Sequence, residues 1–211
     1  MVQIKKSSLV LIVLGTVCVA AALLLFLYNM WDDARAGIQV NEEKERLIAV
    51  VLPQSSAVRI SPEKQAAEEE ELTEEEVYLE MPVKEMDGVE YAAVLSIPSL
   101  SLELPVRNEW SYSGLQSSPC RYTGSAFMND LVICAHNYSQ HFGRLKDLEI
   151  GSDVLLVDME GNLFQYRVAL IETIMPTDVE KMTDSEYDLS LFTCTLGGQT
   201  RVTVRCLRVI E

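Results

Sequence analysis

The sequence LSLFTCTLGGQTRVTVR, residues 189–205, predicts two strands joined by a tight turn. Apolar and polar side chains alternate on both sides of Gly197 and Gly198, and a period of two is typical of strands with one buried face. Glycine adopts backbone angles that other residues avoid, so the pair favours a turn. Cys194 then ends one strand and Arg201 begins the next. We expect this thiol and this guanidinium to share one small volume, as a candidate site that takes its base from elsewhere.

The C-terminal part of the chain contains several more short strand patterns. Alternating or wholly apolar segments predict strands at residues 91–95, 99–106, 131–135, 154–157 and 163–171. The last two flank a turn-type sequence, which predicts a hairpin. Residues 110–124 are rich in Ser, Gly and Tyr and predict a loop, and Asp178 is suited to cap a one-turn helix that ends at Met182. Seven or eight short strands in about 120 residues predict an all-β fold, a closed or nearly closed antiparallel β-barrel with short helices.

His136 follows the apolar strand at residues 131–135 and is the predicted base. A free thiol with a pKa of about 8.5 is mostly protonated at neutral pH, so a nearby His or Arg is needed to make it a useful nucleophile. Strands that end in His136 and Cys194 and a third that opens with Arg201 suit one rim of a barrel. The rival base, His141, lies inside a polar loop sequence and is less favoured. The alternative is that Cys194 and His136 serve only in packing and hydrogen bonding.

An uncharged stretch at residues 9–28 predicts a membrane-spanning helix. Its length at about 1.5 Å per residue is about 30 Å, the thickness of a bilayer core. Two lysines precede it, which favours a cytoplasmic N-terminus at residues 1–8. A cleaved signal peptide is the alternative, because residues 20–22 are small. The apolar run continues past them to Tyr28, so an uncleaved signal anchor is favoured.

Charge and cysteine content limit the classes of partner and site. The chain has 17 Lys and Arg against 32 Asp and Glu, a net charge of -15, which argues against nucleic acid as a partner because phosphates need a basic face. Much of the acid lies between residues 63 and 90. Residues 29–88 therefore predict a solvated acidic stalk, with an ordered cap as the alternative, ahead of a folded domain at residues 89–211.

The five cysteines include no C-x-x-C spacing, and the chain has only two histidines, which argues against a zinc site. Cys134 and Cys206 each lie within an apolar strand pattern. Free cysteine behaves as a small hydrophobic residue, so packing of these two thiols is favoured over a structural disulfide.

Three segments resemble the sortase family. LFTCTLGGQTRVTVR, residues 191–205, is similar to its signature, in which a strand ends in Thr and Cys and an Arg opens the next strand. LVICAHNY, residues 131–138, resembles the family's strand that ends in His, although Ala135 stands where glycine is usual. YAAVLSIPSLSLELPV, residues 91–106, resembles its opening strands. The motifs occur in the family's order between about residues 89 and 209, and sortases usually carry an N-terminal signal anchor as well.

The resemblance implies a cysteine transpeptidase anchored through residues 9–28 in the membrane of a Gram-positive cell, with an extracellular catalytic domain. It implies that Cys194 is the nucleophile, His136 the general acid and base, and Arg201 the oxyanion or substrate clamp. The enzyme would cleave the C-terminal sorting signal of secreted surface proteins through a thioester and transfer them to an amine of a peptidoglycan precursor or of a pilin. No cofactor is implied; part of the family depends on calcium, and no convincing carboxylate cluster for it is visible here.

Finer sequence features bear on the subclass and on two rival functions. The HNY…HFG…L stretch, which begins at His136, is closest to class B-like members, although residues 172–190 are short for their helical insertion. An anchoring role is favoured over pilin polymerisation, because no Asp-Pro-aromatic lid signature is present. A papain- or caspase-like protease also needs His and Cys, but the Gln-Ala-Cys-x-Gly signature and long helical patterns are absent. A membrane-tethered, non-catalytic β-barrel that binds surface proteins is the other alternative, and it predicts that Cys194 is no more reactive to alkylation than the other cysteines.

Overall fold

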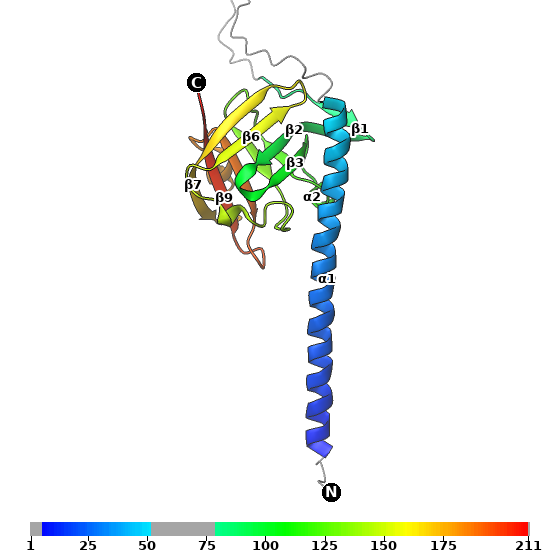
Figure 1. Ribbon diagram of the computed structural model, residues 1–211. Coiled ribbons are helices and arrows are strands. Elements are labelled where there is room, and N and C mark those ends of the chain that lie inside the picture. Colours follow the sequence, from blue (N-terminus) through cyan, green and yellow to red (C-terminus); the bar gives the residue numbers. More distant parts are fainter. Residues whose placement is uncertain (1–5, 52–78, 211) are drawn as a thin grey trace, which may run out of the picture. The chain divides into compact units, whose positions relative to one another are not determined.

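The computed structural model describes residues 6–51 and 79–210, which form a long N-terminal helix and a β-barrel (Figure 1). The chain divides into two compact units, Met1–Arg35 and Ala36–Glu211. The most acidic stretch of the predicted stalk, residues 63–78, lies outside the described residues.

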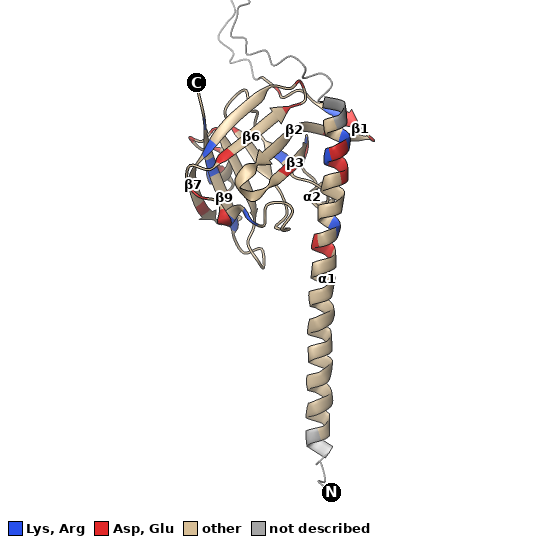
Figure 2. Ribbon diagram, viewed as in Figure 1, with Lys and Arg blue, Asp and Glu red and all other residues tan. Residues whose placement is uncertain are grey.

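Helix α1 spans Lys6–Val51 and so extends well beyond the predicted anchor at residues 9–28. Residues 29–51 are rich in helix formers and contain no proline. The first proline, which would disrupt a helix, is Pro53. Within the described residues, this is the helix that is long and apolar enough to cross a membrane. Figure 2 shows it without charge over its long apolar stretch, with acidic and basic residues gathered in its C-terminal part.

The part of the chain that the structure describes contains nine strands, of which eight close into a barrel. They are β1 Lys84–Met86, β2 Val89–Ile97, β3 Leu102–Arg107, β4 Cys120–Thr123, β5 Leu131–Cys134, β6 Asp153–Asp158, β7 Leu163–Ile174, β8 Leu189–Cys194 and β9 Arg201–Arg208. The order in the sheet is β1-β2-β3-β4-β5-β8-β9-β7-β6, and β6 pairs again with β2 to close it. The predicted closed barrel is confirmed, and β1 adds a short strand ahead of residue 89.

Short helices lie in the connections between strands. They are η1 Pro98–Leu100, α2 Tyr112–Leu115, η2 Leu145–Asp147 and α3 Val179–Thr183. Helix α3 begins directly after Asp178, where a one-turn helix was expected, although the Asp178 side chain makes no capping hydrogen bond. Helix α2 is a single turn within the segment predicted as a loop.

The prediction that the barrel is antiparallel throughout is wrong for two pairs of strands. β3 pairs with β4 in parallel, and β5 pairs with β8 in parallel. A parallel pair needs a long connection that returns the chain to the same end of the sheet. Residues 108–119, which include α2, make this connection between β3 and β4, and the hairpin β6–β7 with α3 makes it between β5 and β8. The barrel is therefore mixed.

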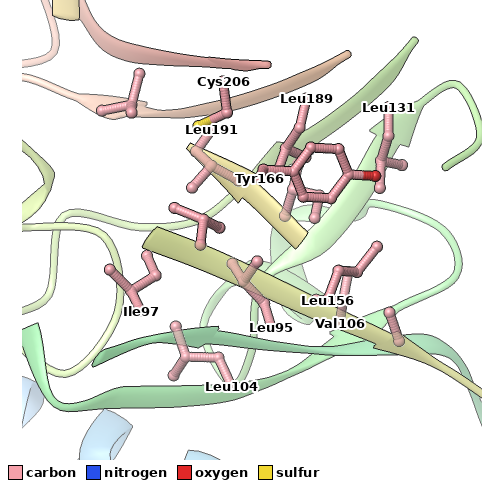
Figure 3. Close-up of a cluster of buried hydrophobic side chains, with 14 of the residues drawn as sticks. Leu95, Ile97, Leu104, Val106, Leu131, Leu156, Tyr166, Leu189, Leu191 and Cys206 are labelled. Carbon is pink, nitrogen blue, oxygen red and sulfur yellow. The ribbon is translucent and has the colours of Figure 1, made fainter. Parts of the chain in front are cut away.

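The barrel interior is filled by apolar side chains from its strands (Figure 3). Alternate residues of a strand face the same side, so Leu189 and Leu191 of β8 both point inward and both are fully buried. Cys206 of β9 belongs to the same cluster, and Cys134 is also buried, so the prediction that these thiols pack as small hydrophobic residues is confirmed. All five cysteines lie in the described residues and are free.

The last part of α1 packs against the barrel within the second unit. Leu47 is fully buried in a cluster with Tyr91 and Val94 of β2. Arg107 of β3 donates from Nη2 to Oε1 of Glu43 at 2.6 Å, and the two side chains are only 17% and 21% exposed. This segment is therefore an integral part of the unit that holds the barrel, rather than a solvated spacer.

Candidate functional site

The three predicted site residues lie on neighbouring strands of the barrel. Strands β5, β8 and β9 are consecutive in the sheet. Cys194, the last residue of β8, is paired directly with Arg201, the first residue of β9. Cys134, the last residue of β5, is in register with Phe192 in the parallel β5–β8 pair. His136 lies two residues beyond Cys134, just as Cys194 lies two residues beyond Phe192, so the same rim of the barrel receives all three.

A groove with a volume of about 230 Å³ opens at this rim and is lined by Cys194, His136 and Arg201. All three side chains are partly exposed, as groups that meet a substrate must be. The remaining walls are mostly apolar or aromatic. They are formed by Trp110, Tyr112, Leu115, Tyr122, Cys134, Ala135, Met175, Pro176, Asp178, Val179, Met182, Phe192 and Thr193.

A hydrogen bond from the residue before the thiol links the ends of β5 and β8. Thr193 is buried, and its Oγ1 donates to the carbonyl oxygen of Ala135 at 2.9 Å. The Ala135 amide in turn donates to the carbonyl of Phe192 at 3.2 Å. These two bonds extend the link between the strands by one residue past the end of β5, and they hold the backbone immediately before Cys194 and immediately before His136.

The turn between β8 and β9 orients Arg201. Gly197 and Gly198 have φ values of 84° and 72°, which glycine adopts without steric cost, as the sequence predicted. Arg201 donates from Nη1 to the carbonyls of Gly198 at 3.0 Å and Thr200 at 3.1 Å. The guanidinium is thus held on its own hairpin, and Arg201 lines the groove together with Cys194, its partner in the strand pairing.

The geometry separates the two histidines. His136 lines the groove, and its ring lies 5.2 Å from that of Tyr138 between centroids. His141 is fully buried and is not part of the groove wall. The structure therefore favours His136 over His141 as the base, in agreement with its position at a strand end.

Burial distinguishes Cys194 from the other barrel thiols. Burial raises the pKa of Cys120 to about 11 and that of Cys206 to about 12. Burial, followed by the neighbouring Cys120, also raises the pKa of Cys134 well above its usual value. These three thiols stay protonated at neutral pH, and Cys194 is the partly exposed barrel thiol beside a histidine and an arginine.

Two walls of the groove were not identified as functional from the sequence. The aromatic wall comes from Trp110, Tyr112 and Tyr122, which all lie in the segment predicted as a loop. The sequence signal for this wall was the occurrence of three large aromatic residues in a polar segment. The second wall comes from α3 and the residues before it. Among the described residues, no group of three or more His, Cys, Asp or Glu side chains is placed to hold a metal ion.

Comparison with known proteins shows the family of this chain. The Sortase domain family matches residues 95–209, more than half of the chain and a range that includes Cys194, His136 and Arg201. The chain belongs to the sortase family. As a sortase it is a cysteine transpeptidase, and its barrel rules out the papain and caspase folds.

Solved sortase structures share the fold. Sortase A from Corynebacterium diphtheriae, in a lid-mutant form, has a TM-score of 0.52 and 24% identity, over 58% of this chain and 72% of that one. Sortase C1 from Streptococcus agalactiae has a TM-score of 0.50 and 25% identity, over 56% of this chain and 67% of that one. A sortase D5 transpeptidase from Clostridium perfringens has a TM-score of 0.50 and 17% identity, over 57% and 79% of the two chains. No curated protein sequence matches significantly. The predicted class B-like subclass stays a prediction.

Proposed function

We propose that this sortase uses Cys194 as nucleophile, His136 as general acid and base, and Arg201 as the cation that binds the reacting carbonyl or the peptide backbone. The observation that carries the proposal is that the three side chains, contributed by three consecutive strands, line one groove.

The first half of the reaction forms a thioester. The sulfur of Cys194 attacks the carbonyl carbon of the scissile peptide bond, and negative charge develops on the carbonyl oxygen. His136 in its protonated form gives its proton to the departing amine, so the C–N bond breaks and the acyl group remains on sulfur. Arg201 is permanently charged and donates hydrogen bonds from a planar fork, which suits the developing oxyanion.

The second half transfers the acyl group to an amine. An acceptor amine attacks the thioester carbonyl, His136 takes the proton that the amine loses, and the thiolate of Cys194 leaves. Water competes in the same step and gives hydrolysis. The donor substrates we propose are secreted surface proteins with a C-terminal sorting signal. An amine of a peptidoglycan precursor is the favoured acceptor, and a pilin lysine is the alternative.

The cellular location follows from α1. We propose that residues 9–28 anchor the protein in the cell membrane of a Gram-positive bacterium, with the N-terminus in the cytoplasm and the barrel outside. The uncharged stretch of the helix and its exposed side chains support an anchor, because none of the apolar window is buried against protein. A surface enzyme that acts on secreted proteins needs this arrangement.

The test uses the full-length chain in detergent micelles with a library of fluorescent peptides that carry pentapeptide sorting signals. We expect a covalent acyl adduct on Cys194, detected by mass spectrometry, and transfer to an added amine. Cys194→Ala should lose the adduct and the transfer while keeping the fold. Cys134→Ala removes the other groove thiol and should still form the adduct. Arg201→Lys should lose most activity, because a point charge does not reproduce the planar fork.

Three results would overturn parts of this assignment. Transfer by Cys194→Ala would place the nucleophile elsewhere. Near wild-type rates for Arg201→Lys would make Arg201 structural. A wild-type chain that processes no peptide, and whose Cys194 is alkylated no faster than the other cysteines, would favour a non-catalytic binding module. Competition between a cell-wall peptide amine and a pilin-derived lysine peptide as acceptors distinguishes anchoring from polymerisation.

A further inference from the structure

Arg205 is a fully buried charged residue outside the groove, with only 1% of its surface exposed. It lies on β9 four residues after Arg201. Residues at i, i+2 and i+4 of a strand face the same side, so Arg201, Thr203 and Arg205 form one row. Val204 and Cys206 point into the barrel core instead. Something must therefore cover the outer face of β9 where Arg205 lies.

The cover is the end of α3 and the residues after it, and three of the five side-chain hydrogen bonds of Arg205 go to this segment, the longest of them to Oγ of Ser185 at 3.5 Å. Its Nη2 donates to the carbonyl of Lys181 at 2.6 Å, and its Nη1 donates to the carbonyl of Met182 at 3.1 Å. Nη1 also donates to Oγ of Ser190 on β8 at 2.7 Å. One planar group thus joins the last carbonyls of a short helix to the barrel wall.

Glu172 of β7 balances the buried charge. Nε of Arg205 donates to Oε1 of Glu172 at 3.1 Å, and Nζ of Lys181 donates to Oε2 at 2.7 Å. Burial by itself raises the pKa of Glu172, but these hydrogen bonds outweigh it and hold the pKa below its usual value. The carboxylate is therefore ionised at neutral pH and links β7, β9 and α3.

The held segment is a wall of the groove. Asp178, Val179 and Met182 all line it, and Met182 is 6% exposed with its sulfur 4.0 Å from Oγ1 of Thr203. A helix of five residues has little stability of its own, because helix nucleation is unfavourable. The position of this wall must therefore come from tertiary contacts, which include the hydrogen bonds from Arg205 to two α3 carbonyls and the ion pair of Lys181 with Glu172.

We infer that Arg205 is a positioning residue for substrate binding: it fixes α3 against the barrel and so sets the position of this wall of the groove. The inference rests on the proposed function, since it assumes that the sorting peptide lies in this groove. It assigns Arg205 no contact with substrate and no effect on the reactivity of Cys194.

The decisive variant is Arg205→Lys in the full-length chain in detergent. Lysine keeps the charge beside Glu172 but has no planar fork that reaches two carbonyls and Ser190 together. We expect KM for the sorting peptide to rise about tenfold, kcat to change less than about twofold, and the alkylation rate of Cys194 by iodoacetamide to stay unchanged. Arg208→Lys is the matched control: Arg208 lies on the same strand, contacts Ala126 and Asn129 away from the groove, and should leave KM unchanged.

A second readout does not depend on activity. Hydrogen–deuterium exchange of peptides covering residues 179–188 should become faster in Arg205→Lys and stay at the wild-type rate in Arg208→Lys. Glu172→Gln keeps the shape of the acceptor and serves where the lysine variant folds poorly; it should shift exchange and KM in the same direction. Unchanged exchange overturns the inference, as does an equal loss in kcat and in Cys194 alkylation. If the wild-type chain turns over no peptide, the proposed function fails, and exchange alone still decides whether Arg205 holds α3.

Discussion

Removing the hydroxyl of Thr193 should impair catalysis as well as stability. Thr193 is 3% exposed, and its Oγ1 donates to the Ala135 carbonyl at 2.9 Å, across the gap between the Cys194 strand and the residue before His136. Thr193→Val keeps the shape and removes the donor. A buried acceptor left without its donor costs about 1–3 kcal/mol. We therefore expect a modest loss of stability and a local shift of the chain at His136.

The catalytic effect follows from alignment. Proton transfer between His136 and the leaving amine needs hydrogen-bond distances, so a small displacement of the histidine relative to the thiol raises the barrier. If the displacement raises the activation free energy by about 1.4 kcal/mol, the rate falls about tenfold. Thr193→Ser is the matched control, because it keeps the hydroxyl and loses one buried methyl group, at about 1 kcal/mol of stability.

The assay is kcat/KM for peptide cleavage by the full-length chain, at a temperature where near-UV circular dichroism shows every variant folded. Thr193→Val should fall at least about tenfold, and Thr193→Ser should stay within about twofold of wild type. A larger loss in Thr193→Ser than in Thr193→Val would mean that the methyl group, and not the hydrogen bond, supports the site. Wild-type activity in Thr193→Val would refute the alignment argument altogether.

Three further predictions concern stability, and thermal unfolding of the full-length chain in detergent checks each one. Glu43→Gln removes the charge that pairs with the largely buried guanidinium of Arg107, so it should destabilise the second unit by about 1–3 kcal/mol. Gly124→Ala should cost at least about 1–3 kcal/mol in backbone strain, since φ is 81°, and more because the added Cβ would lie 2.1 Å from the Asp130 carbonyl oxygen. Because the pKa of Glu172 is lowered in the folded protein, its carboxylate stabilises the fold at neutral pH, and that contribution disappears as pH falls below 4.5. In Glu172→Gln the unfolding temperature should therefore depend less on pH below 4.5 than in the wild type.

The strands around the site were predictable because their local signals agree. Residues 189–194 and 201–208 largely alternate and flank two glycines, so strand, turn and the pairing of Cys194 with Arg201 all follow from short-range rules. His136 was distinguishable from His141 by its place directly after an apolar strand. The barrel follows in the same way, since many short strands with few helices have few ways to bury their apolar faces.

Long-range pairing was not predictable from the same patterns. A period of two predicts a strand but not its partner, so the parallel pairs β3–β4 and β5–β8 are decided by the packing of the connections. Arg205 shows the same limit at one residue. In the alternation of β9 it has the pattern of an ordinary outward polar residue, and only the fold places α3 over it. The extension of α1 beyond the anchor was missed because its charges suggested a solvated spacer.

The parallel β5–β8 pair has a consequence for how the site divides its tasks. In a parallel pair both strands end at the same edge of the sheet. Cys194 is therefore the last residue of β8, and His136 follows two residues after the end of its parallel partner β5. Their relative position therefore depends on the strand pairing and on the Thr193 bond, together with the Phe142 amide that donates to the His136 carbonyl at 3.2 Å. The position of the wall formed by α3 depends instead on Arg205 and Glu172, whose side chains lie on the outer face of β9 and β7. Substitutions in the first set should lower kcat at constant KM, and substitutions in the second should raise KM at constant kcat. If substitutions in either set changed kcat and KM together, the same contacts would support both the chemistry and peptide binding. That result would contradict this geometry.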